Sequence, residues 1–362
     1  MSSSSSPEIL RNRLLWEDSS ESDNSSDYEN RPIRAPRNFR MRFDHFTRWS
    51  DEEFRVRFRL TKETVRVLEQ RFQDDIAPKT ARNHAITAMQ QILIVLRFCA
   101  TGCMLQTVGD FAGIHKATAT PEYINMPRTP EEIERNKRNF YRIAKFPRVI
   151  GAIDCTHIKI ISPGGANAEN FRNRKGYFSL NVQVVGDANL YIRDIVARWP
   201  GSTHDQTIFN NSLLKARFEN NEFGNSIMVG DSGYALRKYL ITPMLDPTVN
   251  VEHVFNESQI RSRNPIERLF GVLKRRFPIL SLGIRLSLDS AKLVIIACAV
   301  LHNIALSLNE PDPIDDPFVT ADYGSNENAA GIDGPRENPR ENNNLRHEFL
   351  LYFMNLLEEN EA

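Results

Sequence analysis

Four acidic residues stand out because of the segments that carry them. Asp154 lies inside the apolar stretch VIGAIDCTHIKI, where a buried carboxylate is costly unless a cation pairs with it. Asp231 ends the short apolar stretch NSIMVGD, and Glu267 lies beside the apolar face of the amphipathic stretch RSRNPIERLFGVLKRRF. Asp205 ends the segment WPGSTHD. A strand, a later strand beside it and a covering helix would bring these acids together.

Converging carboxylates repel one another unless divalent metal lies between them. Oxygen ligands without a cysteine or histidine set favour Mg²⁺ or Mn²⁺. Two such ions about 4 Å apart activate water and stabilise the leaving oxygen in phosphodiester cleavage. We therefore predict a divalent metal cofactor, Mg²⁺ or Mn²⁺, held by Asp154, Asp205, Asp231 and Glu267.

Each acid also has a purely structural interpretation, which the sequence leaves open. The alternatives are a hydrogen bond to a loop for Asp154, a turn for Asp231, a helix N-cap for Asp205, and an ion pair with Arg263 or Arg268 for Glu267.

Basic residues flank the acids, as binding of a polyanion requires. One group lies in NFRNRKGYFS, and residues 256–286 hold 7 Lys+Arg against 2 acids. A solvated helix end favoured by the helix dipole is the alternative for the second group. The predicted DNA-binding residues are Arg172, Arg174, Lys175, Arg261, Arg263, Lys274, Arg275 and Arg276.

The net charge of zero hides a strong asymmetry. Residues 1–30 hold 2 Lys+Arg against 7 Asp+Glu, and residues 308–362 hold 3 against 13. The segment 31–307 therefore carries +15, from 41 Lys+Arg and 26 Asp+Glu. A basic body between acidic tails indicates a polyanionic partner, with tails that compete for the same surface. A solvated surface with disordered tails is the alternative.

Six ordered segments resemble successive blocks of the PIF/Harbinger-type DDE transposases, most closely the nucleases that derive from Harbinger transposases in animals. They are GAIDCTHIKI, YFSLNVQVVGDANLYIRDI, WPGSTHDQTIF, MVGDSGYALRKYLITP, FNESQIRSRNPIERLFGVLKRRFPIL and VIIACAVLHNIA. The resemblance covers about residues 50–307. It implies an RNase H-like catalytic domain, with Asp154, Asp231 and Glu267 as catalytic acids and Asp205 as an additional metal ligand.

The chain divides by composition and pattern into an α/β protein with tails. Periodicity predicts strands at 149–161, 178–185, 191–198 and 225–231, and helices near 205–218, 261–277 and 287–307. The predicted parts are a disordered acidic Ser-rich tail (1–30), a basic arm (31–49), a helical DNA-binding region (50–139), an RNase H-like DDE nuclease domain (140–307) and an acidic tail with a short amphipathic helix (308–362).

The helical region is incomplete as a DNA-binding unit. Ser50 with Glu53 forms a capping box, Thr61 can cap a second helix, and Gly102 closes a third. The segment LQTVGDFAGIHKATAT resembles the start of a helix-turn-helix, but Pro121 ends it early. In the related family the recognition helix continues, so about one helix is missing here.

The predicted function is a metal-dependent nuclease of transposase origin that hydrolyses DNA phosphodiester bonds by a two-metal mechanism. The alternative is a catalytically silent domesticated transposase that acts as a DNA-binding or adaptor protein. The resemblance implies a Myb/SANT-like protein partner and placement in the nucleus, with the cytoplasm as a second compartment. No membrane is expected, because the longest apolar run, 293–301, is too short to span one. The sequence indicates no oligomeric state.

Overall fold

A computed structural model describes residues 44–78, 86–102, 122–313 and 339–361 of the chain. These residues belong to one compact unit, Phe43–Ala362. The predicted acidic N-terminal tail, most of the basic arm and the helix-turn-helix segment lie outside the described residues.

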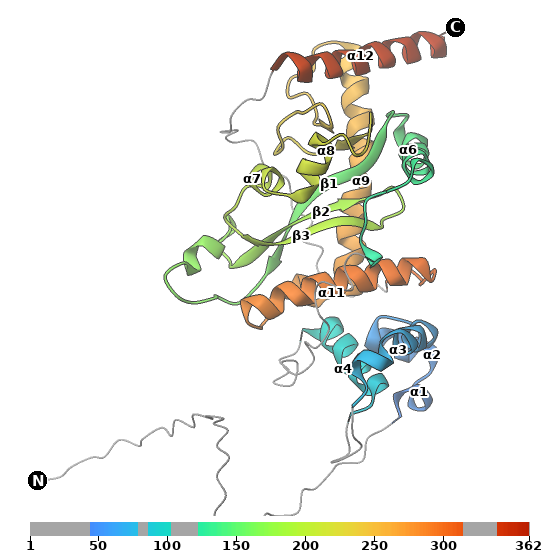
Figure 1. Ribbon diagram of the computed structural model, residues 1–362, viewed down its shortest axis with the longest axis vertical. Coiled ribbons are helices and arrows are strands. Elements are labelled where there is room, and N and C mark those ends of the chain that lie inside the picture. Colours follow the sequence, from blue (N-terminus) through green and yellow to red (C-terminus); the bar gives the residue numbers. More distant parts are fainter. Residues whose placement is uncertain (1–43, 79–85, 103–121, 314–338, 362) are drawn as a thin grey trace, which may run out of the picture. The chain divides into compact units, whose positions relative to one another are not determined.

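A mixed five-stranded sheet forms the centre of this unit (Figure 1). β1, β2 and β3 are antiparallel neighbours, whereas β4 and β5 run parallel to β1 on its other side. The α/β class is thus confirmed, and the sheet order β3-β2-β1-β4-β5 fits the RNase H-like arrangement that the family resemblance implies. The strands are β1 (Val149–Lys159), β2 (Ser179–Gly186), β3 (Ile192–Pro200), β4 (Ile227–Val229) and β5 (Leu240–Ile241).

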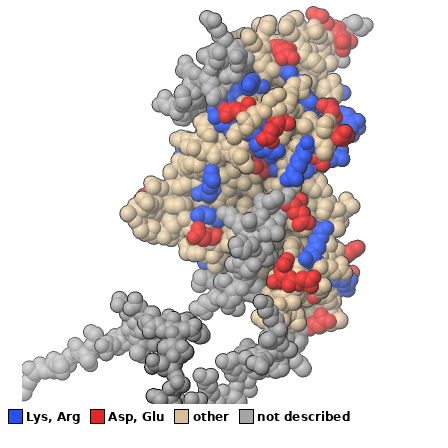
Figure 2. All heavy atoms as spheres, viewed as in Figure 1, with Lys and Arg blue, Asp and Glu red and all other residues tan. Residues whose placement is uncertain are grey.

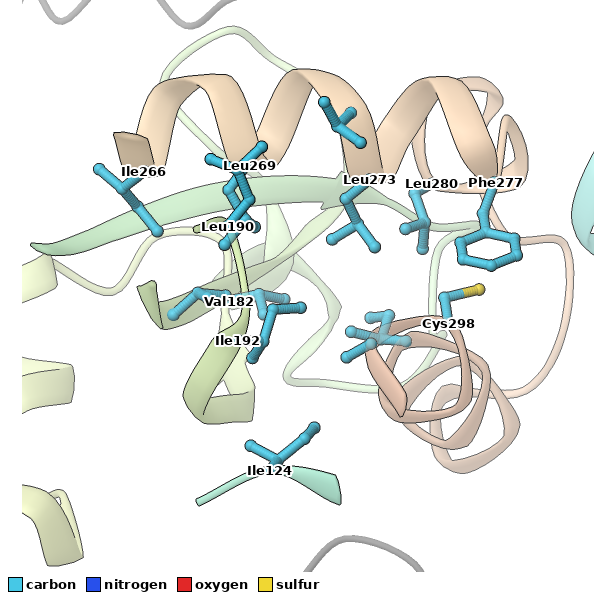
Figure 3. Close-up of a cluster of buried hydrophobic side chains, with 14 of the residues drawn as sticks. Ile124, Val182, Leu190, Ile192, Ile266, Leu269, Leu273, Phe277, Leu280 and Cys298 are labelled. Atoms are coloured by element: carbon cyan, nitrogen blue, oxygen red, sulfur yellow. The ribbon is translucent and has the colours of Figure 1, made fainter. Parts of the chain in front are cut away.

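The long helix α9 (Asn250–Arg276) crosses one face of the sheet. Its apolar residues Ile266, Leu269 and Leu273 point toward Val182 and neighbouring side chains of the sheet (Figure 3). The helix can approach closely because β2 ends in Gly186, where a Cβ atom would lie 2.8 Å from Leu269 Cδ1. The predicted amphipathic helix at 261–277 is confirmed, and it begins further upstream than predicted.

Two short helices contribute to the core on the opposite face. The predicted single helix near 205–218 is wrong in detail, since α7 (Asp205–Asn210) ends before α8 (Leu213–Glu219) begins. The break follows from Ser212, which caps α8 by accepting a hydrogen bond from the backbone N–H of Lys215. Ser212 has an extended backbone conformation, so the chain leaves α7 there and begins a new helix.

The N-terminal helices share their core with the helices behind the sheet. The capping box of Ser50 and Glu53 and the Thr61 cap are confirmed, and Gly102 ends α4 with a φ of 63°. Cys99 of α4 lies with its sulfur 3.9 Å from that of Cys298 on α11. These helices are α1 (His45–Arg48), α2 (Asp51–Phe58), α3 (Lys62–Ile76), α4 (Ala88–Thr101), α10 (Ile279–Leu282) and α11 (Leu288–Ser307).

α11 has the length and apolar character of a membrane span, which core helices of folded proteins share. Two of its polar side chains are buried and bonded to the sheet. His302 Nε2 lies 2.9 Å from the Leu190 carbonyl oxygen, and the Asn303 amide donates to the Ile192 carbonyl oxygen at 2.8 Å. These contacts are those of a core helix.

Two further helices lie beside the start of β1. α6 (Pro130–Ala144) packs against β1 and α9, so it lies with the sheet rather than with the N-terminal helices. The C-terminal amphipathic stretch is a helix, α12 (Pro339–Glu361), which packs on α9. Its Phe349 and Phe353 are buried against Phe146 and Phe255.

Candidate active site

Three of the four predicted acids meet at one end of the parallel strands. One oxygen each of Asp154, Asp205 and Asp231 lies within 4.8 Å of the other two, and we call these residues the acid cluster. β1 supplies Asp154, the first turn of α7 supplies Asp205, and Asp231 follows β4. Because Ala152 pairs with Val229 in the parallel register, Asp154 and Asp231 stand at the same level of the sheet.

Hydrogen bonds from neighbouring elements fix the acid cluster. The Asn181 amide of β2 donates to Asp205 Oδ1 at 2.8 Å, and the backbone N–H of Gly233 donates to Asp231 Oδ1 at 3.0 Å. The amide of Gln259 on α9 donates to the Gly230 carbonyl oxygen at 2.7 Å. The carboxylates are therefore held in place by a rigid frame before any ligand binds.

The acid cluster has more negative charge than the protein neutralises. Burial, and then the charge of Asp231, raise the pKa of Asp154 to about 8, although Arg263 opposes the shift. Burial and the charge of Asp205 raise the pKa of Asp231. Asp231 Oδ2 is buried and has no hydrogen-bond partner among the described residues. An orphaned oxygen among three converging carboxylates fits a hard divalent cation.

Glu267 lies next to the acid cluster rather than inside it. Its Oε1 accepts from Arg263 Nη2 at 2.7 Å, and Arg263 Nη1 lies 3.3 Å from Asp154 Oδ2. One guanidinium thus separates Glu267 from Asp154. The ion pair with Arg263 that the sequence left open is present, and the catalytic role of Glu267 stays a prediction.

The predicted DNA-binding residues fall into different environments. Burial lowers the pKa of the His157 imidazole, and the charges of three of them, Lys274, Lys175 and Arg174, lower it further. Asp205 acts on the same imidazole in the opposite direction, and Arg174 Nη2 lies 3.1 Å from Nδ1 of His204, the residue before Asp205.

Two of the predicted DNA-binding residues are largely buried. Arg276 is only 1% exposed and donates a hydrogen bond to the Pro311 carbonyl oxygen, because its turn of α9 packs under the chain that follows α11. Arg263 has a side chain that is 12% exposed and binds the acids instead of facing a duplex.

The other three predicted residues keep exposed or half-buried positions. Arg172 pairs with Glu169 at 2.7 Å beside the entry to β2. Arg261 donates to the Ile143 carbonyl oxygen, which places it at the C-terminal end of α6. Arg275 donates to the Gly271 carbonyl oxygen within α9.

The sequence interpretation missed the residues that hold the acids. Asn181 and Gln259 are both buried, and each anchors an acid-bearing segment through its side-chain amide. A signal for Asn181 is present, since it is a polar residue inside the apolar strand SLNVQVVG, as Asp154 is in its own strand. Gln259 lies in a polar part of α9 and carries no such signal.

Comparisons with known proteins identify the family to which this chain is similar. Residues 153–303 match the model of the DDE superfamily endonucleases. The chain is 29% identical to "Putative nuclease HARBI1" of Rattus norvegicus (85% of this chain, 93% of the relative) and 31% identical to that of Mus musculus (77% and 85%). Identity to the protein of the same name in Homo sapiens is 30% (74% and 80%). No solved structure matches.

Proposed function

The chain belongs to the family of Harbinger transposase-derived DDE nucleases, and we propose that it hydrolyses DNA phosphodiester bonds with divalent metal. The observation that carries the proposal is the acid cluster, in which oxygens of Asp154, Asp205 and Asp231 lie within 4.8 Å of one another. Three carboxylates from three separate elements are costly to bring together in the interior unless they bind a cation.

We assign the metal ligands by position. Asp154, Asp205 and Asp231 would hold one ion. Glu267 would bind a second ion together with Asp154 if the Arg263 guanidinium moved from between them. Bound in this way, Mg²⁺ or Mn²⁺ ions activate the attacking water and stabilise the leaving oxygen. The hydrogen bonds to Asp205 and Asp231 keep the carboxylates in position through the reaction, so that little reorganisation accompanies it.

Basic side chains beside the cluster would hold the DNA backbone. The charges of Arg174, Lys175 and Lys274 act on the His157 imidazole, as the charge of Asp205 does, and a strand bound at the acid cluster would come near them. On the face in Figure 2, basic and acidic side chains are intermixed rather than gathered by sign. The +15 charge of residues 31–307 therefore attracts DNA in general, whereas local groups such as these three orient it.

The catalytically silent alternative retains DNA binding and predicts no cleavage. We place either form in the nucleus, where the substrate is, with the cytoplasm as a second compartment, and we propose a Myb/SANT-like partner to supply the DNA recognition of the incomplete helix-turn-helix. Both ideas rest on the family resemblance.

The test is a cleavage assay on plasmid and linear duplex with Mg²⁺, Mn²⁺ or EDTA. Wild type should cut only with metal, and Asp154→Ala should cut at background. Asp289→Ala is the matched control, since Asp289 is an exposed acid on α11 that pairs with Lys292. Equal cleavage by wild type and Asp154→Ala would reject the proposal, and no cleavage by wild type would favour the adaptor.

A further inference from the structure

A small basic cavity lies away from the acid cluster, between the start of α6 and the start of β3. It has a volume of about 200 Å³, below the roughly 300–1,000 Å³ of most organic-ligand pockets. We call it the arginine pocket. Its lining residues are Asn125, Met126, Pro127, Arg128, Glu132, Arg135, Asn136 and Arg193.

A buried amide in this pocket has no partner. Asn136 is only 5% exposed, it lines the pocket, and its side chain makes no hydrogen bond to any residue that the structure describes. The amide atoms of Asn136 are not among the fully buried atoms that lack a partner, so they contact the solvent of the pocket. A ligand that enters the pocket would replace this water and bond the amide.

The charge of the pocket specifies the sign of that ligand. Arg128, Arg135 and Arg193 face a single lining acid, Glu132. Glu132 Oε2 accepts from the backbone N–H of Arg128 at 2.7 Å and caps α6, so this carboxylate is already used by the helix. Arg193 also pairs at 2.6 Å with the buried Asp187, which leaves a net positive charge even when that acid is counted.

Geometry at the arginines favours a phosphate group. A guanidinium presents a planar fork of N–H donors that matches phosphate oxygens. The Arg135 side chain is exposed at the pocket and has no ion pair or hydrogen bond among the described residues. A single phosphate with a few donors around it also suits the small volume, whereas a whole nucleotide would not fit.

The sheet register places this pocket within reach of the same duplex as the acid cluster. Val184 pairs with both Asp154 and Ile195, so Arg193 lies two strands across and two residues along from Asp154. With the usual strand spacings, this separates their Cα atoms by about 12 Å. The major groove of B-DNA is also about 12 Å wide.

We propose that the arginine pocket binds one backbone phosphate of the DNA substrate, with Asn136 and Arg135 as its ligands, and so anchors the duplex about one groove width from the acid cluster. The proposal deepens the proposed function and rests on DNA being the substrate. The pocket contributes affinity and orientation, whereas the acids do the chemistry.

Duplex binding measured by fluorescence anisotropy in EDTA tests the pocket without cleavage. We expect Arg135→Gln to weaken binding about tenfold, as loss of one charge-assisted contact would. The slope of log affinity against log salt should shrink by about 1. Arg142→Gln is the matched control, because Arg142 is an exposed arginine of α6 about two turns from Arg135. It should stay within about twofold of wild type.

Asn136→Leu separates a ligand role from a structural one. It removes the unpartnered amide, so it should weaken DNA binding and leave the salt slope unchanged, while its melting temperature stays close to that of wild type. Unaltered DNA affinity in Asn136→Leu and Arg135→Gln would overturn the proposal. A further arm adds inorganic phosphate at constant ionic strength and records the melting temperature.

Phosphate that stabilises wild type but not Arg135→Gln, with DNA affinity unaltered in that variant, would assign the pocket to another phosphate source and overturn the DNA assignment. The proposed pocket and the proposed nuclease activity can be rejected independently of each other. A selective loss of binding in Arg135→Gln supports the pocket even if wild type cuts no DNA.

Discussion

The acid cluster and the arginine pocket both adjoin the central sheet, yet their charges are unbalanced in opposite directions. At the acid cluster, negative charge accumulates at the ends of β1 and β4, and Asp231 Oδ2 has no partner. At the arginine pocket, three arginines and the amide of Asn136 surround a cavity. The first site is complete only with a cation, and the second only with an anion.

This difference separates chemistry from anchoring. The acid cluster is held rigidly by Asn181 and Gly233, as a site that must stabilise charge in a transition state requires. The arginine pocket is lined by Arg135, an exposed and adaptable side chain, which suits binding of a backbone that varies in shape. Substitutions at the two sites should therefore affect different steps.

The largest expected effect is on the rate of DNA cleavage, which should fall much further for variants of the acid cluster than for variants of the arginine pocket. Asp154→Asn and Asp231→Asn should each lower the rate of DNA cleavage by a thousandfold or more, on the order of 4 kcal/mol of lost transition-state stabilisation. Arg135→Gln should lower kcat/KM only about tenfold, through the loss of one phosphate contact. Single-turnover cleavage with Mn²⁺ measures all three.

A comparable loss of rate in Arg135→Gln and Asp154→Asn would remove the distinction between the sites. Glu267→Gln sharpens it further. If Glu267 is a metal ligand, this variant should lose cleavage rate about as much as the aspartate variants do. If Glu267 serves only as the partner of Arg263, the loss should be about tenfold, as for Arg135→Gln.

A second effect is a dependence of stability on pH that the acid cluster should produce and the arginine pocket should not. The folded pKa of Asp154 is raised to about 8, above its unfolded value near 4. The folded state keeps this proton between about pH 4 and pH 8, where the unfolded state releases it. The free energy of unfolding in EDTA should therefore fall as pH rises through this window, by at most about 5 kcal/mol.

Asp154→Asn removes that proton, so its stability relative to wild type should grow from pH 5 to pH 8. Urea melts at both values give the difference. A constant difference across the window would show that Asp154 is ionised and paired at both pH values.

The sequence predicted that Asp154, Asp205 and Asp231 converge, but it gave no indication of the arginine pocket. A charged residue inside an apolar strand, such as Asp154, is conspicuous because the strand around it must be buried. Asn136 lies between Ile133 and Phe140 on the apolar face of PEEIERNKRNFYRIA, so helical phase predicts its burial but not the cavity beside it. Only tertiary contact with the chain around Met126 and Arg193 encloses it.

The burial of Arg276, by contrast, could have been predicted from its position in the helical repeat alone. It lies seven residues after Leu269 and three after Leu273, on the apolar face of α9. The run of basic residues at 274–276 nevertheless suggested a solvated end. Its burial depends on Pro311, which returns past the end of α9 and accepts its hydrogen bond.

A smaller effect concerns the exposed cations near the acid cluster. Replacing Arg172, Arg174 and Lys175 by alanine should reduce the salt slope of DNA binding by about 2 to 3, since each lost phosphate contact removes about 0.9. Anisotropy titrations from 50 to 200 mM salt report the slope. An unaltered slope would move the DNA surface elsewhere, with the basic arm at 31–42 as the next candidate.

The smallest effect is on the stability of the pocket. Asn136→Leu should leave the free energy of unfolding within about 1 kcal/mol of wild type, because the amide has no protein partner to lose and contacts only the solvent of the pocket. Inorganic phosphate should stabilise wild type and not this variant. A loss of more than about 1 kcal/mol in Asn136→Leu would mean that the amide already has a partner in the folded protein.

The most direct test of the acid cluster as a metal site is a set of thermal melts with EDTA and with Mn²⁺. Mn²⁺ at a hundred times its dissociation constant should stabilise wild type by about 2.7 kcal/mol, by mass action on the folded state. Asp154→Asn keeps the shape and removes the charge, so at pH 7.5 in EDTA it should be at least as stable as wild type and should respond weakly to Mn²⁺. If Asp154→Asn instead loses the same stability in EDTA and in Mn²⁺, Asp154 is a structural aspartate and the metal site loses its first ligand.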